Sequence, residues 1–344
     1  MTETGGGARL PRKAPVMADV AKLAGVSHQT VSRVVNGSDH VKDDTIKRVL
    51  DAMQKLDYRP NPVARALATG KSKTLGVVSF NTTLYGPAST LFGLERAAHG
   101  AGYFVSIVSL LSLDRSSVLD AVERLRAQGV GGILVIAPQT VAAHAVSQLP
   151  NDIPVVAVEA GPAEGVPVVT VDQFAGAELA TQHLLDLGHR TVWHISGPDD
   201  WLEAQQRIAG WRSTLETAGA RVPPVLAGDW GSRSGYELGR RLAADPEVTA
   251  VFAANDAMAL GLLRALHEAG RTPPSAVSVV GFDDCPEATY FIPPLTTIRQ
   301  DFLEVGRRAL NLMLEEIESG SRSATCLPVP PELVVRQSTG SPRQ

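Results

Sequence analysis

The chain has 344 residues, enough for two or three domains, and 44% hydrophobic with 20% charged residues is typical of a soluble globular protein. No apolar run reaches the roughly 20 residues of a membrane helix, and the first 15 residues lack the apolar core of a secretory signal. The two cysteines, Cys285 and Cys326, have neither disulfide-framework nor metal-ligand spacing. We therefore expect a cytoplasmic protein with no metal, no cofactor and no membrane partner.

Charge is unevenly distributed along the chain. Residues 1–73 carry 13 Lys/Arg and 7 Asp/Glu, whereas the remainder carries 19 and 29. A basic N-terminal segment on an acidic body favours contact between that segment and a polyanion such as DNA. A solvated basic tail is the alternative interpretation.

Residues 1–14 are rich in Gly, Pro and Arg and are expected to form a disordered tail. Residues 15–59 predict a small domain of three helices, over 16–24, 27–35 and 44–56, with Ser27 as the N-cap of the second. Each helix has one apolar face, and together these faces suffice for one core. The faces consist of Val16, Val20 and Leu23, then Val31, Val34 and Val35, then Ile46, Val49, Leu50, Met53 and Leu56.

The first two helices have the pattern of a helix-turn-helix DNA reader. Small Ala21 lets the helices cross closely, and Gly25 permits the tight turn between them. The second helix then presents its polar start to the major groove, where Gln pairs with adenine and Arg with guanine. A plain three-helix cap on an enzyme is the alternative. The predicted DNA contacts of this domain are Ser27, His28, Gln29, Thr30, Ser32, Arg33 and Asn36.

Residues 60–73 predict a hinge helix and linker, with Asn61 as the cap and Pro62 at the first helical position. The helical stretch is about eight residues, shorter than the roughly 12–15 that hold a helix alone in water. We therefore expect the hinge to fold only on DNA.

From Leu75 onward, short β-branched runs alternate with helical patterns, which indicates parallel sheets covered on both faces. There are too many strands for one compact sheet, so we predict two lobes within a core of residues 74–338. Lobe 1 is assigned residues 74–171 plus 302–325, lobe 2 is assigned 173–298 plus 326–338, and 339–344 is a tail. The predicted strands lie in 75–80, 103–109, 131–137, 153–159, 191–197, 224–229, 250–255 and 277–283, with a late helix over 302–319.

The run VMADVAKLAGVSHQTVSRVVNGSDHVKDDTIKRVLDAMQKLDYRPNPVARALA resembles the DNA-binding head of the LacI/GalR family. The resemblance covers about residues 16–338, and GFDD followed by IPPLTTIRQDF is similar to the lactose-repressor branch. It implies an all-α helix-turn-helix domain joined to an α/β periplasmic-binding-protein-like core of two doubly wound parallel-sheet lobes. It further implies that paired hinge helices enter the minor groove through Asn61, Ala64 and Leu67, with Leu67 as the wedge.

Two hinge helices need two chains, so we expect a homodimer on a near-palindromic double-stranded operator. The family's tetramers use a C-terminal leucine-heptad helix, and the last residues of this chain contain no heptads. We expect no tetramer.

By match to the family, the sugar effector contacts are Arg207, Trp230, Asn255, Asp283, Gln300, Phe302 and Asp172. A guanidinium can bind two hydroxyls at once, and an aromatic ring can lie on the apolar face of a sugar. Trp230 favours a galactoside over a purine. Asp172 contacts the ligand or only fixes the crossover between lobes. Asp256 and Asp284 are expected to be helix caps, with ligand contact as the alternative, and a role as a cap alone is the alternative for Asn255.

These features predict a transcriptional repressor of carbohydrate-utilisation genes, on the nucleoid when bound to its operator and released by the sugar. A corepressor, or a sugar other than a galactoside, is the alternative within the family. No GxGxxG, GxxxxGK[ST], GxSxG or HExxH motif supports an enzyme. A periplasmic sugar-binding protein or a DNA-binding protein without a ligand are more distant alternatives.

Overall fold

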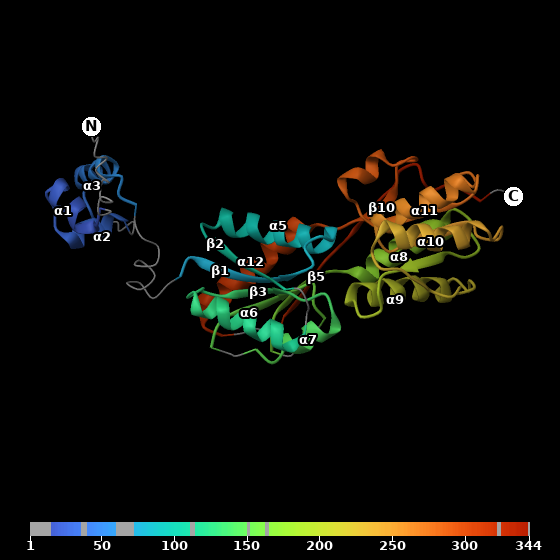
Figure 1. The fold of residues 1–344 in the computed structure, drawn as a ribbon, viewed down its shortest axis with the longest axis horizontal. Coiled ribbons are helices and arrows are strands. Elements are labelled where there is room, and N and C mark those ends of the chain that lie inside the picture. The colour runs from blue at the N-terminus through green and yellow to red at the C-terminus, as the bar shows by residue number, and fades with distance from the viewer. Residues whose placement is uncertain are drawn as a thin grey trace, which may run out of the picture. The chain divides into compact units, whose positions relative to one another are not determined.

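A computed structural model describes residues 15–35, 40–59, 72–110, 114–149, 152–161, 165–321 and 325–342 (Figure 1). The predicted tail over 1–14 and all but the last two residues of the predicted hinge over 60–73 lie outside these described ranges. The chain divides into two compact units, Met1–Lys71 and Ser72–Gln344. Among the helices described, none is long and apolar enough to cross a bilayer.

The N-terminal unit contains the three predicted helices, α1 (Met17–Ala24), α2 (His28–Val35) and α3 (Asp43–Leu56). Their buried residues are small or β-branched: Val20, Ala21, Ala24, Val31, Val49 and Ala52.

The predicted apolar faces are wrong in part, because Val16, Leu23 and Leu50 are 48%, 51% and 52% exposed. Alanines occupy the positions where the helices of this small domain approach each other closely. The buried face of each helix is therefore narrower than the apolar face predicted from the sequence, and Val16, Leu23 and Leu50 lie outside the buried face.

The turn between α1 and α2 has the predicted geometry. Gly25 adopts a left-handed φ of 65°, and its N–H donates to the carbonyl of Ala21. The Ser27 hydroxyl accepts a hydrogen bond from the Thr30 N–H at 3.1 Å, which confirms Ser27 as the cap of α2. Glycine at the turn and a hydroxyl at the cap thus fix the angle between the two helices.

The second unit contains two six-stranded sheets. The first has the order β11-β5-β4-β3-β1-β2 and is parallel throughout. Helices α5 and α12 cover one face and α6 and α7 cover the other (Figure 1). Its elements are β1 (Thr74–Phe80), α5 (Tyr85–Gly100), β2 (Phe104–Leu110), α6 (Arg115–Ala127), β3 (Ile133–Ile136), α7 (Thr140–Val146), β4 (Val155–Val158), β5 (Val168–Val171), α12 (Phe302–Ser319) and β11 (Cys326–Val329).

The second sheet has the order β12-β10-β9-β8-β6-β7, and only β12 runs antiparallel, against β10. Helices α8 and α9 cover one face, and α10 and α11 cover the other (Figure 1). Its elements are α8 (Gln173–Asp186), β6 (Trp193–Ser196), α9 (Leu202–Thr217), β7 (Leu226–Ala227), α10 (Ser232–Ala243), β8 (Ala250–Ala253), α11 (Asp256–Glu268), β9 (Ser278–Asp283), the 3₁₀ helix η1 (Pro286–Tyr290), β10 (Thr296–Arg299) and β12 (Glu332–Val334).

Two predicted boundaries are wrong. Residues 326–329 were assigned to lobe 2, but they form β11, which pairs with β5 in the sheet of lobe 1. Residues 339 and 340 belong to lobe 2 and not to a tail, because Thr339 bonds His183 and Gly340 bonds His189 and Ser278. The first error arises from strand pairing and the second from side-chain hydrogen bonds, and contacts of either kind between distant segments leave no local pattern in the sequence.

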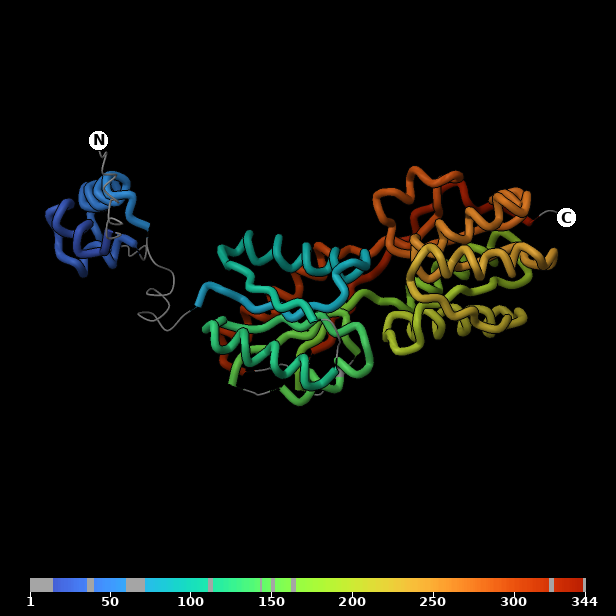
Figure 2. The backbone as a smooth tube through the Cα atoms, in the orientation of Figure 1, coloured from blue at the N-terminus to red at the C-terminus, as the bar shows by residue number. Residues whose placement is uncertain are grey.

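The chain passes between the two sheets three times (Figure 2). The first crossing joins β5 to α8, the second joins β10 to α12, and the third joins β11 to β12. Three connecting segments between two lobes form a pivot, because a change in the angle between the lobes requires a change of backbone conformation only in these segments.

Candidate functional site

The polar start of α2 forms a candidate DNA-binding surface. Ser27, His28, Gln29 and Arg33 are exposed, and Thr30 and Ser32 are half-buried. Val31 is fully buried beneath them, so the polar face is held by the core on its opposite side. The other predicted DNA contacts, Asn36, Asn61, Ala64 and Leu67, lie outside the described residues.

A narrow pocket lies in the second unit, with walls from both lobes. Its free volume is about 20 Å³, on the order of one water molecule, so binding of a larger ligand requires lobe or side-chain movement. The lining residues of lobe 1 are Leu84, Tyr85, Gly86 and Pro87, and those of lobe 2 are Trp201, Glu203, Arg207, Trp230, Asn255 and Asp283.

Arg207 of α9 is the cationic residue of the pocket and is only 1% exposed. Its Nε donates to Gln173 Oε1 at 2.8 Å, and its Nη1 donates to the Ala254 carbonyl. The guanidinium lies 3.7 Å above the ring of Phe282 and 3.7 Å from a carboxylate oxygen of Glu203. These contacts hold the guanidinium in one orientation, which suits recognition of paired hydroxyls.

Trp230 forms an apolar wall of the pocket and is 5% exposed. Its backbone has a left-handed φ of 71°, and its carbonyl accepts a hydrogen bond from Asn255 Nδ2 at 3.1 Å. The indole meets Trp201 edge-to-face at 5.6 Å and packs on Gly197, where an added Cβ would lie 2.1 Å from the ring. Among the described residues, none accepts a hydrogen bond from the Trp230 Nε1–H. A buried donor of this kind is suited to a ligand acceptor.

Asp283 ends β9 at the carboxyl edge of the second sheet, the usual position for ligands in such folds. Both Asp283 and Asp284 have positive φ, 117° and 53°, so the chain turns sharply there. The Asp283 carboxylate accepts from Gln300 Nε2 at 2.7 Å, and Gln300 Oε1 accepts from Gln173 Nε2 at 2.9 Å. Burial raises the pKa of Asp283 well above its ordinary value.

Two further carboxyl groups lie in this region: buried Glu159, near the pocket, and half-buried Glu203, which lines it. Glu159, which follows β4 in lobe 1, is 4% exposed, and its Oε2 accepts from Thr170 Oγ1 and the Val171 N–H. Burial, and then the charge of Glu203, raises the pKa of Glu159 to about 8. Burial likewise raises the pKa of Glu203, although Arg207 opposes this shift. The protonation of Glu159 therefore changes at a pH near 8.

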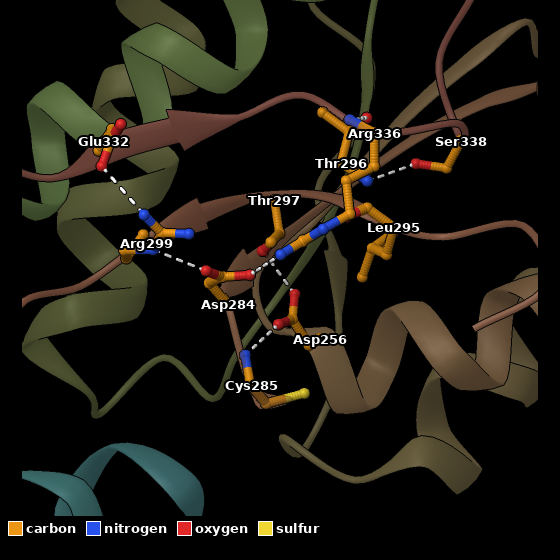
Figure 3. Close-up of polar contacts among 10 residues, drawn as sticks. All are labelled: Asp256, Asp284, Cys285, Leu295, Thr296, Thr297, Arg299, Glu332, Arg336 and Ser338. Atoms are coloured by element: carbon orange, nitrogen blue, oxygen red, sulfur yellow. Dashed lines mark hydrogen bonds and ion pairs between the residues drawn. The ribbon is translucent and has the colours of Figure 1, made fainter. Parts of the chain in front are cut away.

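Asp256 and Asp284 were expected to be helix caps, and this prediction is wrong (Figure 3). Asp284 forms ion pairs with Arg299 and Arg336, while Asp256 Oδ1 accepts from Thr297 Oγ1 at 2.6 Å. Asn255 is the cap of α11, through a 2.8 Å bond from the Met258 N–H. The two aspartates instead fix the turn after Asp283 against β10 and the C-terminal segment.

Four of the seven predicted effector residues line the pocket: Arg207, Trp230, Asn255 and Asp283. Gln300 and Phe302 lie behind it, with Phe302 packed edge-to-face on Tyr85 at 6.0 Å. Asp172 caps α8 and lines a separate depression beside Pro330 and Pro331. The structure therefore does not bring Asp172 to the pocket.

The prediction did not assign the lobe 1 wall, Leu84–Pro87, or Glu203 of lobe 2, which also lines the pocket. It also did not assign Glu159 of lobe 1 or Gln173, which lie behind the pocket. The lobe 1 wall follows β1, the first strand of that lobe. Because ligands in such folds bind at the carboxyl ends of strands, this position could have identified the wall from the sequence. Trp201, in the loop between β6 and α9, lines the edge of the pocket, as expected of a loop after a strand end in this fold.

Two family models match the chain. Residues 16–61 match bacterial regulatory proteins of the lacI family, and residues 181–339 match a periplasmic binding protein-like domain. The repressor PurR of Haemophilus influenzae is 35% identical over 332 residues, which cover 94% of this chain and 98% of that protein. The lactose operon repressor of Escherichia coli K12 is 34% identical over 328 residues, which cover 94% and 90%.

Solved structures agree over nearly the whole chain. A lac repressor dimer bound to operator and the anti-inducer ONPF aligns with a TM-score of 0.86 at 32% identity, covering 96% of this chain and 100% of that one. The transcriptional regulator CelR in complex with cellobiose aligns with a TM-score of 0.68 at 31% identity, covering 94% and 99%.

Proposed function

Since the chain belongs to the LacI family of DNA-binding transcriptional repressors and is not an enzyme, we propose that a small saccharide in the interlobe pocket releases it from its operator. The observation that carries this proposal is the pairing of a fixed guanidinium, Arg207, with the indole wall of Trp230 in one pocket. Planar polar groups and an aromatic face together suit a polyhydroxylated ring. Cellobiose in the complex with CelR supports the same ligand class.

We further propose that the ligand is a galactoside and that the regulated genes serve carbohydrate use. The lactose operon repressor is similar over almost all of this chain, which supports this choice. PurR is equally similar, so identity alone does not select the ligand. A corepressor, or a saccharide other than a galactoside, stays the alternative.

The operator is proposed to be near-palindromic and read by a homodimer. The lac repressor relative is a dimer on its operator. This chain exposes large apolar side chains at the edge of its first sheet, where Phe104 is 68% and Ile107 is 47% exposed on β2. Such residues at a sheet edge favour association with a second copy.

The ligand test is a thermal-shift screen of galactosides, glucosides and pentoses on the full-length protein and on Trp230→Ala. A bound saccharide raises the melting temperature of the parent, because ligand binding stabilises the folded state in proportion to RT ln(1 + [L]/Kd). The shift should be lost in Trp230→Ala and kept in Trp193→Phe, a tryptophan of β6 outside the pocket lining. A parent that responds to no saccharide would refute the proposed ligand class.

The sign of regulation is tested by titrating the active saccharide with and without an operator selected from random duplexes. Linkage is reciprocal, so operator DNA weakens the binding of an inducer and strengthens that of a corepressor, typically by 5–150-fold. Equal saccharide affinity in both titrations would remove the proposed coupling.

A further inference from the structure

We infer that Gln173 and Gln300 form a buried relay that positions Arg207 and Asp283 of the effector pocket and couples them to the pivot between the lobes. This inference rests on the proposed function, because the relay ends on two residues of the proposed saccharide site. Neither glutamine lines the pocket itself.

The relay is a continuous chain of hydrogen bonds with one direction. Arg207 Nε donates to Gln173 Oε1 at 2.8 Å, Gln173 Nε2 donates to Gln300 Oε1 at 2.9 Å, and Gln300 Nε2 donates to Asp283 Oδ1 at 2.7 Å. It thus begins at a cation and ends at a carboxyl group. Each amide accepts a hydrogen bond on its Arg207 side and donates one on its Asp283 side, so the bonds polarise one another in the same sense.

The relay is shielded from water. Arg207, Gln173, Gln300 and Asp283 are 1%, 4%, 7% and 7% exposed. A buried amide that loses a partner leaves an unsatisfied polar group, which is costly, so the four side chains shift together more readily than one by one. The spacing of the guanidinium and the carboxyl group across the pocket is therefore set by two residues outside it.

Both glutamines are placed at crossings between the lobes. Gln173 is the first residue of α8, directly after β5 of lobe 1 ends and the capping residue Asp172 begins the turn. Gln300 lies between β10 of lobe 2 and α12, which packs in lobe 1. A change in the angle between the lobes must therefore move the backbones that carry the relay.

The backbone on either side of Gln300 is anchored as well. Arg299 pairs with Asp284 and with Glu332 of β12, after the third crossing (Figure 3). On the other side, Asp301 caps α12 by accepting from the Glu304 N–H at 2.9 Å. When the segment between β10 and α12 moves, the Gln300 side chain therefore moves with it, because the backbone on both sides of Gln300 is held by these contacts.

The length of the glutamine side chain is essential to this role. Gln173 must reach Arg207 of α9 with its oxygen and Gln300 with its nitrogen. Asparagine is one methylene shorter and cannot keep both bonds at these distances. Gln173→Asn is therefore the conservative variant, and Gln173→Leu removes the amide with little change in volume.

The first test needs no ligand and follows the Arg207 Nε–H resonance in ¹⁵N-labelled full-length protein, assigned by Arg207→Lys. Gln300→Leu should shift or broaden this resonance, although Gln300 does not contact Arg207, because it removes the acceptor of the Gln173 amide. The matched control is Gln182→Leu, whose exposed amide bonds Asp186 on the same helix as Gln173. An Arg207 resonance that is equal in parent and Gln300→Leu would overturn the relay.

The second test measures affinity for the saccharide that shifts the parent's melting temperature in the screen, with and without operator duplex. Gln173→Leu and Gln173→Asn should each lose tenfold or more in saccharide affinity, while affinity of the ligand-free protein for the operator stays within threefold of the parent. The opposing result is a variant that has a lower melting temperature and yet binds the saccharide as tightly as the parent, with the same effect of operator DNA on that affinity. This result would show that Gln173 has only a structural role and would overturn the inference. If no saccharide binds the parent, the proposed function fails, and the Arg207 resonance still decides whether the relay exists.

Discussion

The candidate DNA-binding surface on α2 and the pocket between the lobes are both polar, but the side chains of the first are exposed and those of the second are buried. His28, Gln29 and Arg33 project into solvent from a helix whose only fully buried residue is Val31. Arg207 and Asp283 are buried and already bonded to protein partners. Substitutions on the exposed surface should leave folding intact. In the pocket, by contrast, the contacts that position side chains for a ligand also stabilise the fold.

The largest effect is expected where a buried charge loses its partners. Arg207→Met should lower the free energy of unfolding of the core by about 3–5 kcal/mol, because it leaves buried carboxyl and amide groups unpaired. Chemical denaturation of the full-length protein measures this. The matched control is Arg264→Met, which breaks another Arg–Glu pair four residues apart on a helix, where Arg264 is 66% exposed. The expected loss there is under about 1 kcal/mol, and equal losses would break the comparison.

On the candidate DNA-binding surface, a substitution should weaken binding and leave stability unchanged. Arg33→Ala is expected to cost about 1–3 kcal/mol in binding to the selected operator, with the melting temperature unchanged because the side chain is exposed. Gel-shift titration against operator and random duplex measures the effect. Lys47→Ala, an exposed cation on α3, serves as the control and should leave discrimination between the two duplexes intact. An Arg33→Ala variant that discriminates as well as the parent would contradict this prediction.

The carboxyl groups near the pocket predict a dependence of stability on pH. The pKa of Glu159 is about 8 when folded and near 4.5 when unfolded, so the folded state binds the extra proton between these values. Stability from this group is present at low pH and is lost as pH rises toward 8. Glu159→Gln should flatten the fall in unfolding free energy between pH 6.5 and 8, by at most about 1.4 kcal/mol per pH unit.

The buried histidine of β6 changes stability in the opposite direction. Burial lowers the pKa of His194 to about 3, so its contribution to stability rises with pH until the unfolded histidine, with a pKa near 6.5, has lost its proton. This contribution is the same in the parent and in Glu159→Gln, so the difference between their slopes belongs to Glu159. Denaturation curves at several pH values measure both slopes. A slope between pH 6.5 and 8 that is identical in parent and Glu159→Gln would rule out this role of Glu159.

The smallest effect on stability is expected at the N-cap of α2. Ser27→Ala removes the acceptor of the Thr30 N–H and should cost about 1 kcal/mol of helix stability. Hydrogen exchange of the α2 amides measures this loss, and the core should be unaffected. Ser27→Asp, which keeps an acceptor at the cap, should restore protection; if it does not, the hydroxyl acts in some other way.

The sequence by itself determined the local features of this protein. Gly25 and Ser27 specify the turn and the cap because their effects depend only on neighbouring backbone. Apolar runs such as Ile133–Ile136 specified buried parallel strands, since both faces of such strands are covered. Resemblance to the family supplied the pocket residues Arg207, Trp230, Asn255 and Asp283, whose positions at strand ends or on α9 agree with the structure.

Only the tertiary structure decided which distant residues are partners. The pairing of β11 with β5 and the contact of Gln173 with Gln300 join segments more than 120 residues apart, and neither has a local periodicity that reveals it. The burial that raises the pKa of Glu159 likewise comes from the packing of both lobes and not from its neighbours in sequence. Side chains on the candidate DNA-binding surface are positioned by the helix that carries them, whereas buried polar side chains are positioned by the residues that the fold places opposite them.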